Sequence, residues 1–79
     1  MASLRLRLTF PPELITEPVI YSIGRQYNVV TNIRRANVTH DEGWVVLELT
    51  GDANELEEVV DYLTNIEVHA EPVEGDVVQ

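Results

Sequence analysis

Residues 4–10 read Leu4-Arg5-Leu6-Arg7-Leu8-Thr9-Phe10, an unbroken alternation of apolar and polar side chains. Successive side chains of a β-strand point to opposite faces, so this pattern predicts a strand buried on one face only. The leucines and Phe10 face the core, whereas Arg5, Arg7 and Thr9 face the other side. Pro11-Pro12 ends the strand, because proline cannot donate to a β-ladder.

A helix is expected to begin at Thr16-Glu17-Pro18, with Thr16 as the cap and Pro18 in the first turn. Apolar side chains follow at helical spacing: Val19, Ile20, Ile23 and Tyr27. Gly24 lies inside this helix at a cost of roughly 1 kcal/mol relative to alanine. Close packing of the helix on a sheet is the expected reason for that glycine.

Residues 29–39 are rich in β-branched side chains, but neither face is cleanly apolar, which favours an edge position or a β-bulge. A turn at residues 40–43 leads into a strand over residues 44–50. Its inward side chains are Val45, Leu47 and Leu49, and the two strands form an antiparallel hairpin.

Asp52 opens a second helix, and Glu55 three residues later suggests a capping box. The helix has an apolar stripe (Leu56, Val59, Val60, Leu63), ends at Asn65 and is followed by a strand over residues 66–70. The order β-α-β-β-α-β predicts an α+β ferredoxin-like sandwich, in which two helices cover one face of a four-stranded antiparallel sheet. The domain is expected over residues 3–73, followed by an acidic tail over residues 74–79.

The composition of the chain excludes several classes of protein. The chain has 79 residues, 44% apolar, which is enough for one small domain. Its net charge of −9 argues against nucleic acid as a partner. All five arginines lie in residues 1–35, and residues 36–79 contain twelve acids and no base. No segment predicts membrane insertion or a signal peptide, so a cytoplasmic protein is expected.

Candidate catalytic and metal-binding residues are few. Cysteine is absent, and His40 and His69 are the only imidazoles. Metal binding would need further ligands converging on them, and Asp41-Glu42 beside His40 is interpreted as a turn sequence. Acylphosphatases share this topology but use a basic, glycine-rich loop after the first strand, where this chain has Pro11-Pro12-Glu13-Leu14-Ile15. We therefore expect no catalytic residues, no metal and no cofactor, and a non-enzymatic binding module.

The sheet face away from the helices is expected to carry Arg5, Arg7, Trp44, Val46 and Glu48. This half-apolar face makes Trp44, Val46, Arg5 and Arg7 the candidate residues for a partner interface. The arginines could bind an anion or pair with Glu48 across the central strands. Trp44 could stack on a ligand or simply cover a strand end at the hairpin.

The chain resembles the NIL domain family from about Leu4 to Ala70. The resemblance is carried by Leu6-Arg7-Leu8-Thr9-Phe10, Glu17-Pro18-Val19-Ile20, Val29-Val30-Thr31-Asn32-Ile33 with Ala36 and Val38, Gly43, Leu47-Glu48-Leu49-Thr50-Gly51, Tyr62-Leu63 and Ile66-Glu67-Val68. NIL domains are best known as regulatory domains of methionine-importer ATPase subunits, where they pair with a second copy and bind methionine.

The resemblance implies a homodimeric sensor of an amino-acid effector, with a transporter ATPase as a candidate partner protein. The motif asparagine corresponds to Asn32, whose amide can both donate to a carboxylate and accept from an ammonium group. Ile33 is expected to line the pocket. Arg34 replaces the apolar third residue of the family motif, and it could hold an anionic group or point to solvent on an edge strand.

Two hypotheses remain open from the sequence. The first is a sensor of an amino acid such as methionine, with Asn32, Ile33 and Arg34 at the site. The second is a protein–protein adaptor that keeps the fold without a ligand and uses the open sheet face and an edge strand. No nucleotide-binding motif precedes the domain, so a stand-alone protein is expected rather than a fragment of a transporter ATPase.

Overall fold

The computed structural model describes residues 1–14, 17–39 and 41–73, and its elements follow the predicted order β-α-β-β-α-β. They are β1 (Ala2–Phe10), a short 3-10 helix η1 (Pro12–Leu14), α1 (Val19–Gln26), β2 (Val29–Val38), β3 (Gly43–Gly51), α2 (Ala53–Asn65) and β4 (His69–Pro72). The predicted acidic tail, residues 74–79, lies outside the described residues.

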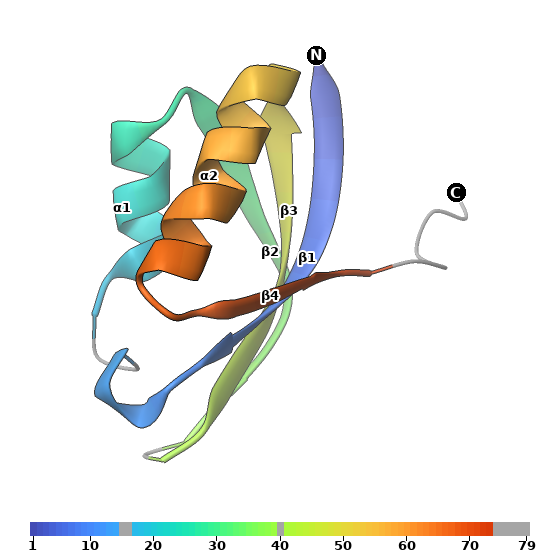
Figure 1. Ribbon diagram of the computed structural model, residues 1–79. Coiled ribbons are helices and arrows are strands. Elements are labelled where there is room, and N and C mark those ends of the chain that lie inside the picture. The colour runs from blue at the N-terminus through green and yellow to red at the C-terminus, as the bar shows by residue number, and fades with distance from the viewer. Residues whose placement is uncertain (15–16, 40, 74–79) are drawn as a thin grey trace.

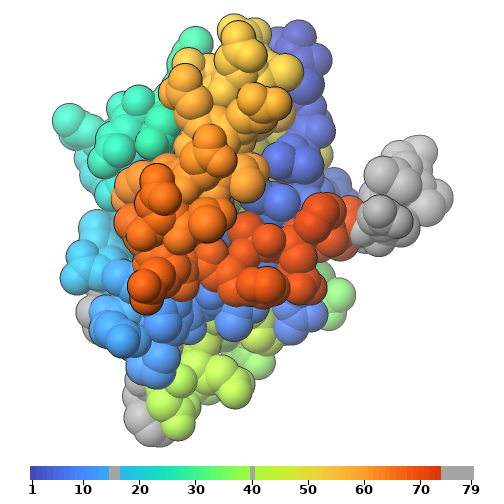
Figure 2. Space-filling model, in the orientation of Figure 1, coloured from blue at the N-terminus to red at the C-terminus, as the bar shows by residue number. Residues whose placement is uncertain are grey.

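The four strands form one antiparallel sheet in the order β2-β3-β1-β4. Both helices lie on the same face of this sheet, as Figure 1 shows, and α2 runs across the middle of that face in the space-filling view of Figure 2. The predicted α+β ferredoxin-like architecture is confirmed.

The core lies between the helices and the central strands. Leu8, Leu47 and Leu49 on the sheet and Ile23, Val59 and Leu63 on the helices are fully buried. The predicted alternation of β1 and β3 is confirmed, since Leu6 and Leu8 are buried whereas Arg7 and Thr9 are exposed. Burial of these side chains removes apolar surface from water, which is the main favourable contribution to folding.

Strand β2 has both of the features that its mixed sequence left as alternatives. It forms one edge of the sheet, and its register against β3 shifts between Ile33 and Arg35, which is a β-bulge at Arg34. Of its residues only Val29 is buried. An edge strand packs against one neighbour only, so a continuous apolar face is not required of it.

The start of α1 differs from the prediction. Helix α1 begins at Val19 and its N-cap residue is Pro18, two residues after the predicted cap, without a side-chain capping bond. Thr16, the predicted cap, lies outside the described residues. The explanation offered for Gly24 is wrong, because this residue is exposed and a Cβ atom there would meet nothing within 4 Å.

The capping box predicted for α2 is also wrong. Asp52 is the N-cap residue but makes no side-chain capping bond. The Glu55 carboxylate instead accepts a hydrogen bond of 2.9 Å from the backbone N–H of Asn28. Glu55 therefore ties the start of α2 to the connection between α1 and β2, which a search for local capping motifs does not detect.

The last strand starts three residues later than predicted because of the way α2 ends. Helix α2 ends at Asn65 as predicted, but the N–H of Glu67 then donates to the Thr64 carbonyl and the N–H of Val68 to the Leu63 carbonyl. This is a Schellman motif, and Glu67 occupies its left-handed position with φ 68°. Strand β4 consequently spans His69–Pro72 rather than residues 66–70.

Replacing Gly24 by alanine tests the exposed position in α1. We expect Gly24→Ala to stabilise the domain by about 0.5–1 kcal/mol, because alanine has the better helix propensity and its methyl group meets no neighbour. Urea unfolding followed by circular dichroism measures this difference. Gly51→Ala is the matched control: its Cβ would lie 2.9 Å from the Asn28 carbonyl oxygen, so a loss of about 1–3 kcal/mol is expected. A destabilised Gly24→Ala variant would contradict the structure.

Candidate functional site

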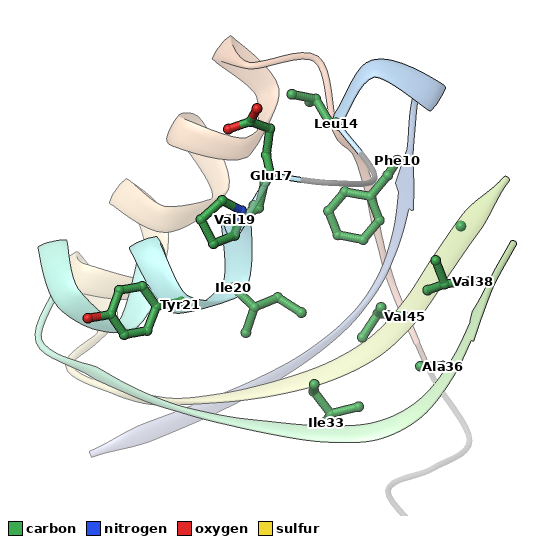
Figure 3. A pocket seen from close by; sticks show the side chains of 12 residues that line it. Phe10, Leu14, Glu17, Val19, Ile20, Tyr21, Ile33, Ala36, Val38 and Val45 are labelled. Atoms are coloured by element: carbon green, nitrogen blue, oxygen red, sulfur yellow. The ribbon is translucent and has the colours of Figure 1, made fainter. Parts of the chain in front are cut away.

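A groove on the helix-covered side of the sheet separates α1 from the edge strand β2. Its volume is about 310 Å³, at the lower end of the range for small-molecule sites. Figure 3 shows Ile33, Ala36 and Val38 of β2 along one wall and Ile20 of α1 opposite them. The remaining lining residues are Phe10, Leu14, Glu17, Pro18, Val19, Tyr21, Gly43 and Val45.

The groove exists because α1 is short. An eight-residue helix is about 12 Å long, whereas a ten-residue strand extends over about 33 Å. The ends of β2 and β3 that meet at their hairpin therefore project beyond the helices, as Figure 1 shows. Ile33 and Val38 remain 54% and 56% exposed for this reason, although both occupy helix-side positions of the strand.

Polar groups lie at the α1 end of the groove. The first backbone bond of α1 runs from the Ser22 N–H to the Pro18 carbonyl, so the N–H groups of Ile20 and Tyr21 precede the helical ladder. Glu17 is the one charged residue among those that line the groove, and its carboxylate points away from β2 in Figure 3. The groove thus combines an apolar wall with backbone donors at one end.

The three ligand-binding residues predicted from the sequence do not lie together at the groove. Ile33 pairs with Leu47 on the helix side and lines the groove. Asn32 pairs with Glu48, and Arg34 forms an ion pair of 3.6 Å with Glu48, which places both on the opposite face. Asn32 is exposed at the edge of the sheet.

The predicted interface residues lie together on the open face of the sheet. Arg5 forms an ion pair of 3.5 Å with Glu48, one of the two alternatives left open for it. The Arg7 guanidinium instead lies over the Trp44 ring, 4.5 Å from the ring centroid. Val46 is next to Arg7 in the sheet register and is only 8% exposed.

Titratable groups are confined to the surface of the described residues. None of their charged or polar side chains is buried, and they contain no group of three or more side chains that could hold a metal ion. His69 is exposed and lies 3.0 Å from the Glu71 carboxylate. His40 is outside the described residues. The charged and polar side chains of the described part therefore all reach its surface.

Sequence reasoning missed most of the groove. It placed Ile33 in a pocket but did not assign Ile20, Ala36 or Val38 to it. One signal was present in the sequence: Ala36 and Val38 are apolar and alternate, while the apolar stripe of the first helix is too short to cover the whole strand. The bulge at Arg34 was needed to place Ala36 and Val38 on the same side as Ile33.

The fold and the groove together define a ferredoxin-like domain with an apolar groove between its first helix and its edge strand. The NIL domain model matches residues 4–72, and the chain belongs to the NIL domain family. Membership of this family supports a role as a regulatory module. A comparison with curated proteins finds no match.

A solved structure gives the same fold. It is the C-terminal domain of an ABC transporter ATP-binding protein from Enterococcus faecalis, which is similar over 91% of this chain and 84% of its own, with a TM-score of 0.77 and 22% identity. Among the described residues, no helix is long and apolar enough to cross a membrane.

Removing the Arg7 side chain tests the geometry of the open face. Because Arg7 covers Trp44, the single tryptophan, we expect Arg7→Ala to shift its fluorescence emission to longer wavelength. The domain should also lose about 0.5–1 kcal/mol of stability with the cation–π contact. Arg25→Ala is the control, since Arg25 lies over Tyr21 on α1, and its tryptophan emission should not change. Equal emission from the Arg7→Ala variant and the wild type would contradict this contact.

Proposed function

We propose that this domain is a non-enzymatic regulatory module that binds a small amino-acid effector in the groove between α1 and β2. Methionine is the first candidate, through the family to which the chain belongs. The observation that carries the proposal is an apolar groove of ligand size that contains Ile33 of the family motif. Binding would be coupled to dimerisation or to a partner protein such as a transporter ATPase.

The groove matches the chemistry of methionine. A thioether side chain is apolar and flexible, so it can fill an irregular wall built from Ile33, Ala36 and Ile20. The carboxylate of the amino acid would meet the N–H groups of Ile20 and Tyr21 at the start of α1, where the helix dipole favours negative charge. The ammonium group would face solvent or the rim residue Glu17.

The position of Asn32 supports a link between ligand binding and pairing of two copies. Asn32 faces away from the groove of its own protomer, but it lies on the outermost strand beside that groove. A second copy packed against β2 could bring its own Asn32 to the polar end of the effector. An effector that contacts both copies binds the dimer more tightly than the monomer, so it shifts the equilibrium toward the dimer.

The adaptor hypothesis has one observation in its favour. Strand β2 has an unpaired edge of ten residues and carries the exposed apolar side chains Val30, Ile33 and Val38. An extended segment of another protein could add to this edge as a fifth strand. Such a segment would occupy the position that a second copy takes in the sensor model. Because the adaptor has no ligand, the two hypotheses make opposite predictions for the binding of an isolated amino acid.

Calorimetric titration with L-methionine tests the sensor, with D-methionine as the ligand control. We expect saturable, stereoselective binding, and light scattering should show a larger dimer fraction when the ligand is present. Ile33→Ser should weaken binding because it removes apolar surface from the groove wall.

Asn32→Ala should weaken methionine binding by more than about 1 kcal/mol if its amide contacts the effector. Asn37→Ala is the matched control, because Asn37 lies on the open-face side of the same strand, opposite Trp44. Unchanged affinity in Asn32→Ala would remove this residue from the site. Absence of binding by the folded wild-type protein to any amino acid would reject the sensor and favour the adaptor.

A further inference from the structure

The open face of the sheet concentrates positive charge in an acidic protein. Four of the five arginines lie on it, because Arg5 and Arg7 alternate outward on β1 and the bulge turns Arg34 and Arg35 to the same side of β2. Two acids, Glu48 and Glu71, share this face in the sheet register. The described strand residues of this face therefore carry a formal charge of +2, in a chain of net charge −9. We call this surface the arginine face.

Pairing within the arginine face leaves cationic groups available. Glu48 lies within 3.6 Å of both Arg5 and Arg34, so one carboxylate is shared by two guanidinium groups. The Arg7 guanidinium lies over the Trp44 ring, 4.5 Å from its centroid, and a guanidinium group carries five N–H donors. Arg35 has no ion pair with a described acid in the structure.

The centre of the arginine face is apolar. Val46 lies between Arg7 on β1 and Arg35 on β2 in the register, and it is 8% exposed although no helix covers it. Aliphatic parts of long cationic side chains commonly cover such positions. Trp44 lies beside Val46 on β3, so the face combines an aromatic and aliphatic floor with guanidinium groups around it.

We propose that the arginine face is a docking site for an acidic segment of another protein, with carboxylates paired to Arg7 and Arg35 and an apolar side chain seated on Trp44 and Val46. Charge complementarity supports this occupant, because planar guanidinium groups bind carboxylates in a bidentate manner. Aromatic and arginine side chains are also the types enriched in protein interfaces.

Other occupants fit the face less well. Two copies in contact through this face would bring eight arginines against only four acids, which opposes a face-to-face dimer. Single-stranded nucleic acid binds through aromatic side chains on which bases stack, but Trp44 is the one aromatic residue placed here by the register and Arg7 already covers it.

The arginine face is separate from the effector groove of the same copy, because the two lie on opposite sides of the sheet. The regulatory module would then have two surfaces: the groove for the effector and the arginine face for the partner that the module controls. Failure of methionine to bind would leave the docking proposal standing, and failure of docking would leave the effector proposal standing.

The test uses a synthetic peptide without aromatic residues, in which glutamates flank a central leucine. The probe is titrated into the full chain at low salt, and Trp44 emission and calorimetry report the binding. We expect saturable binding that weakens as salt is added. The analogue with glutamine in place of every glutamate should bind at least tenfold more weakly, because it cannot form charge-assisted hydrogen bonds.

Single substitutions then locate the binding site. Arg35→Gln and Arg7→Gln should each weaken peptide binding by about twofold to fivefold, and the double variant by about tenfold. Arg25→Gln is the matched control: it removes the same charge from α1, outside the arginine face, and should leave the affinity unchanged. Unfolding curves of all variants verify that the fold is intact.

Three results of the binding experiments would overturn the proposal: no binding of the acidic peptide, equal weakening by Arg25→Gln and Arg35→Gln, or tighter binding of a poly-dT oligonucleotide than of the peptide. The last result would identify the arginine face as a nucleic-acid surface. Growth of larger assemblies in light scattering without any probe, abolished by Arg35→Gln, would also overturn it, because the acidic helices of a second copy would then be the occupant.

Discussion

The length of α1 is the constraint on which the candidate site depends. Eight helical residues can cover about 12 Å of a strand that runs for about 33 Å, so the hairpin end of β2 and β3 has no helix above it. Apolar side chains at Ile33 and Val38 consequently form the wall of a groove instead of part of the closed core. A longer α1 would bury these side chains and remove the groove, so the same mismatch that limits the core provides the space for a ligand.

The sheet separates two kinds of surface. Its helix side is apolar and ends in the groove, and its open side carries the arginine face around Trp44 and Val46. Period-two alternation on β1 and β3 is sufficient to produce this separation. The bulge at Arg34 strengthens it on β2, because two successive arginines face the open side while Ile33 and Ala36 remain on the groove side. One irregularity in an edge strand thus contributes to both surfaces.

The elements in which apolar side chains recur with a simple period could be predicted from the sequence. The alternation of Leu6 and Leu8 predicted the orientation of β1. The mixed pattern of residues 29–39 favoured an edge position or a bulge, and β2 has both. The features that the sequence did not predict depend on contacts or conformations that local sequence patterns do not indicate. Glu55 bonds to Asn28, 27 residues away, and Glu67 takes a left-handed conformation that its residue type does not favour. The groove was missed for a similar reason, because it depends on the relative lengths of α1 and β2.

The most direct test of the account is a two-dimensional ¹H–¹⁵N NMR spectrum of the labelled protein, recorded while L-methionine is added. The account predicts that the largest amide shifts fall on the groove residues Ile20, Tyr21, Ile33, Ala36 and Val38, and that the amides of Arg5, Arg7 and Val46 move little. Shifts centred on the open face, or a spectrum that does not change at saturating methionine, would contradict the claim that the groove is the effector site.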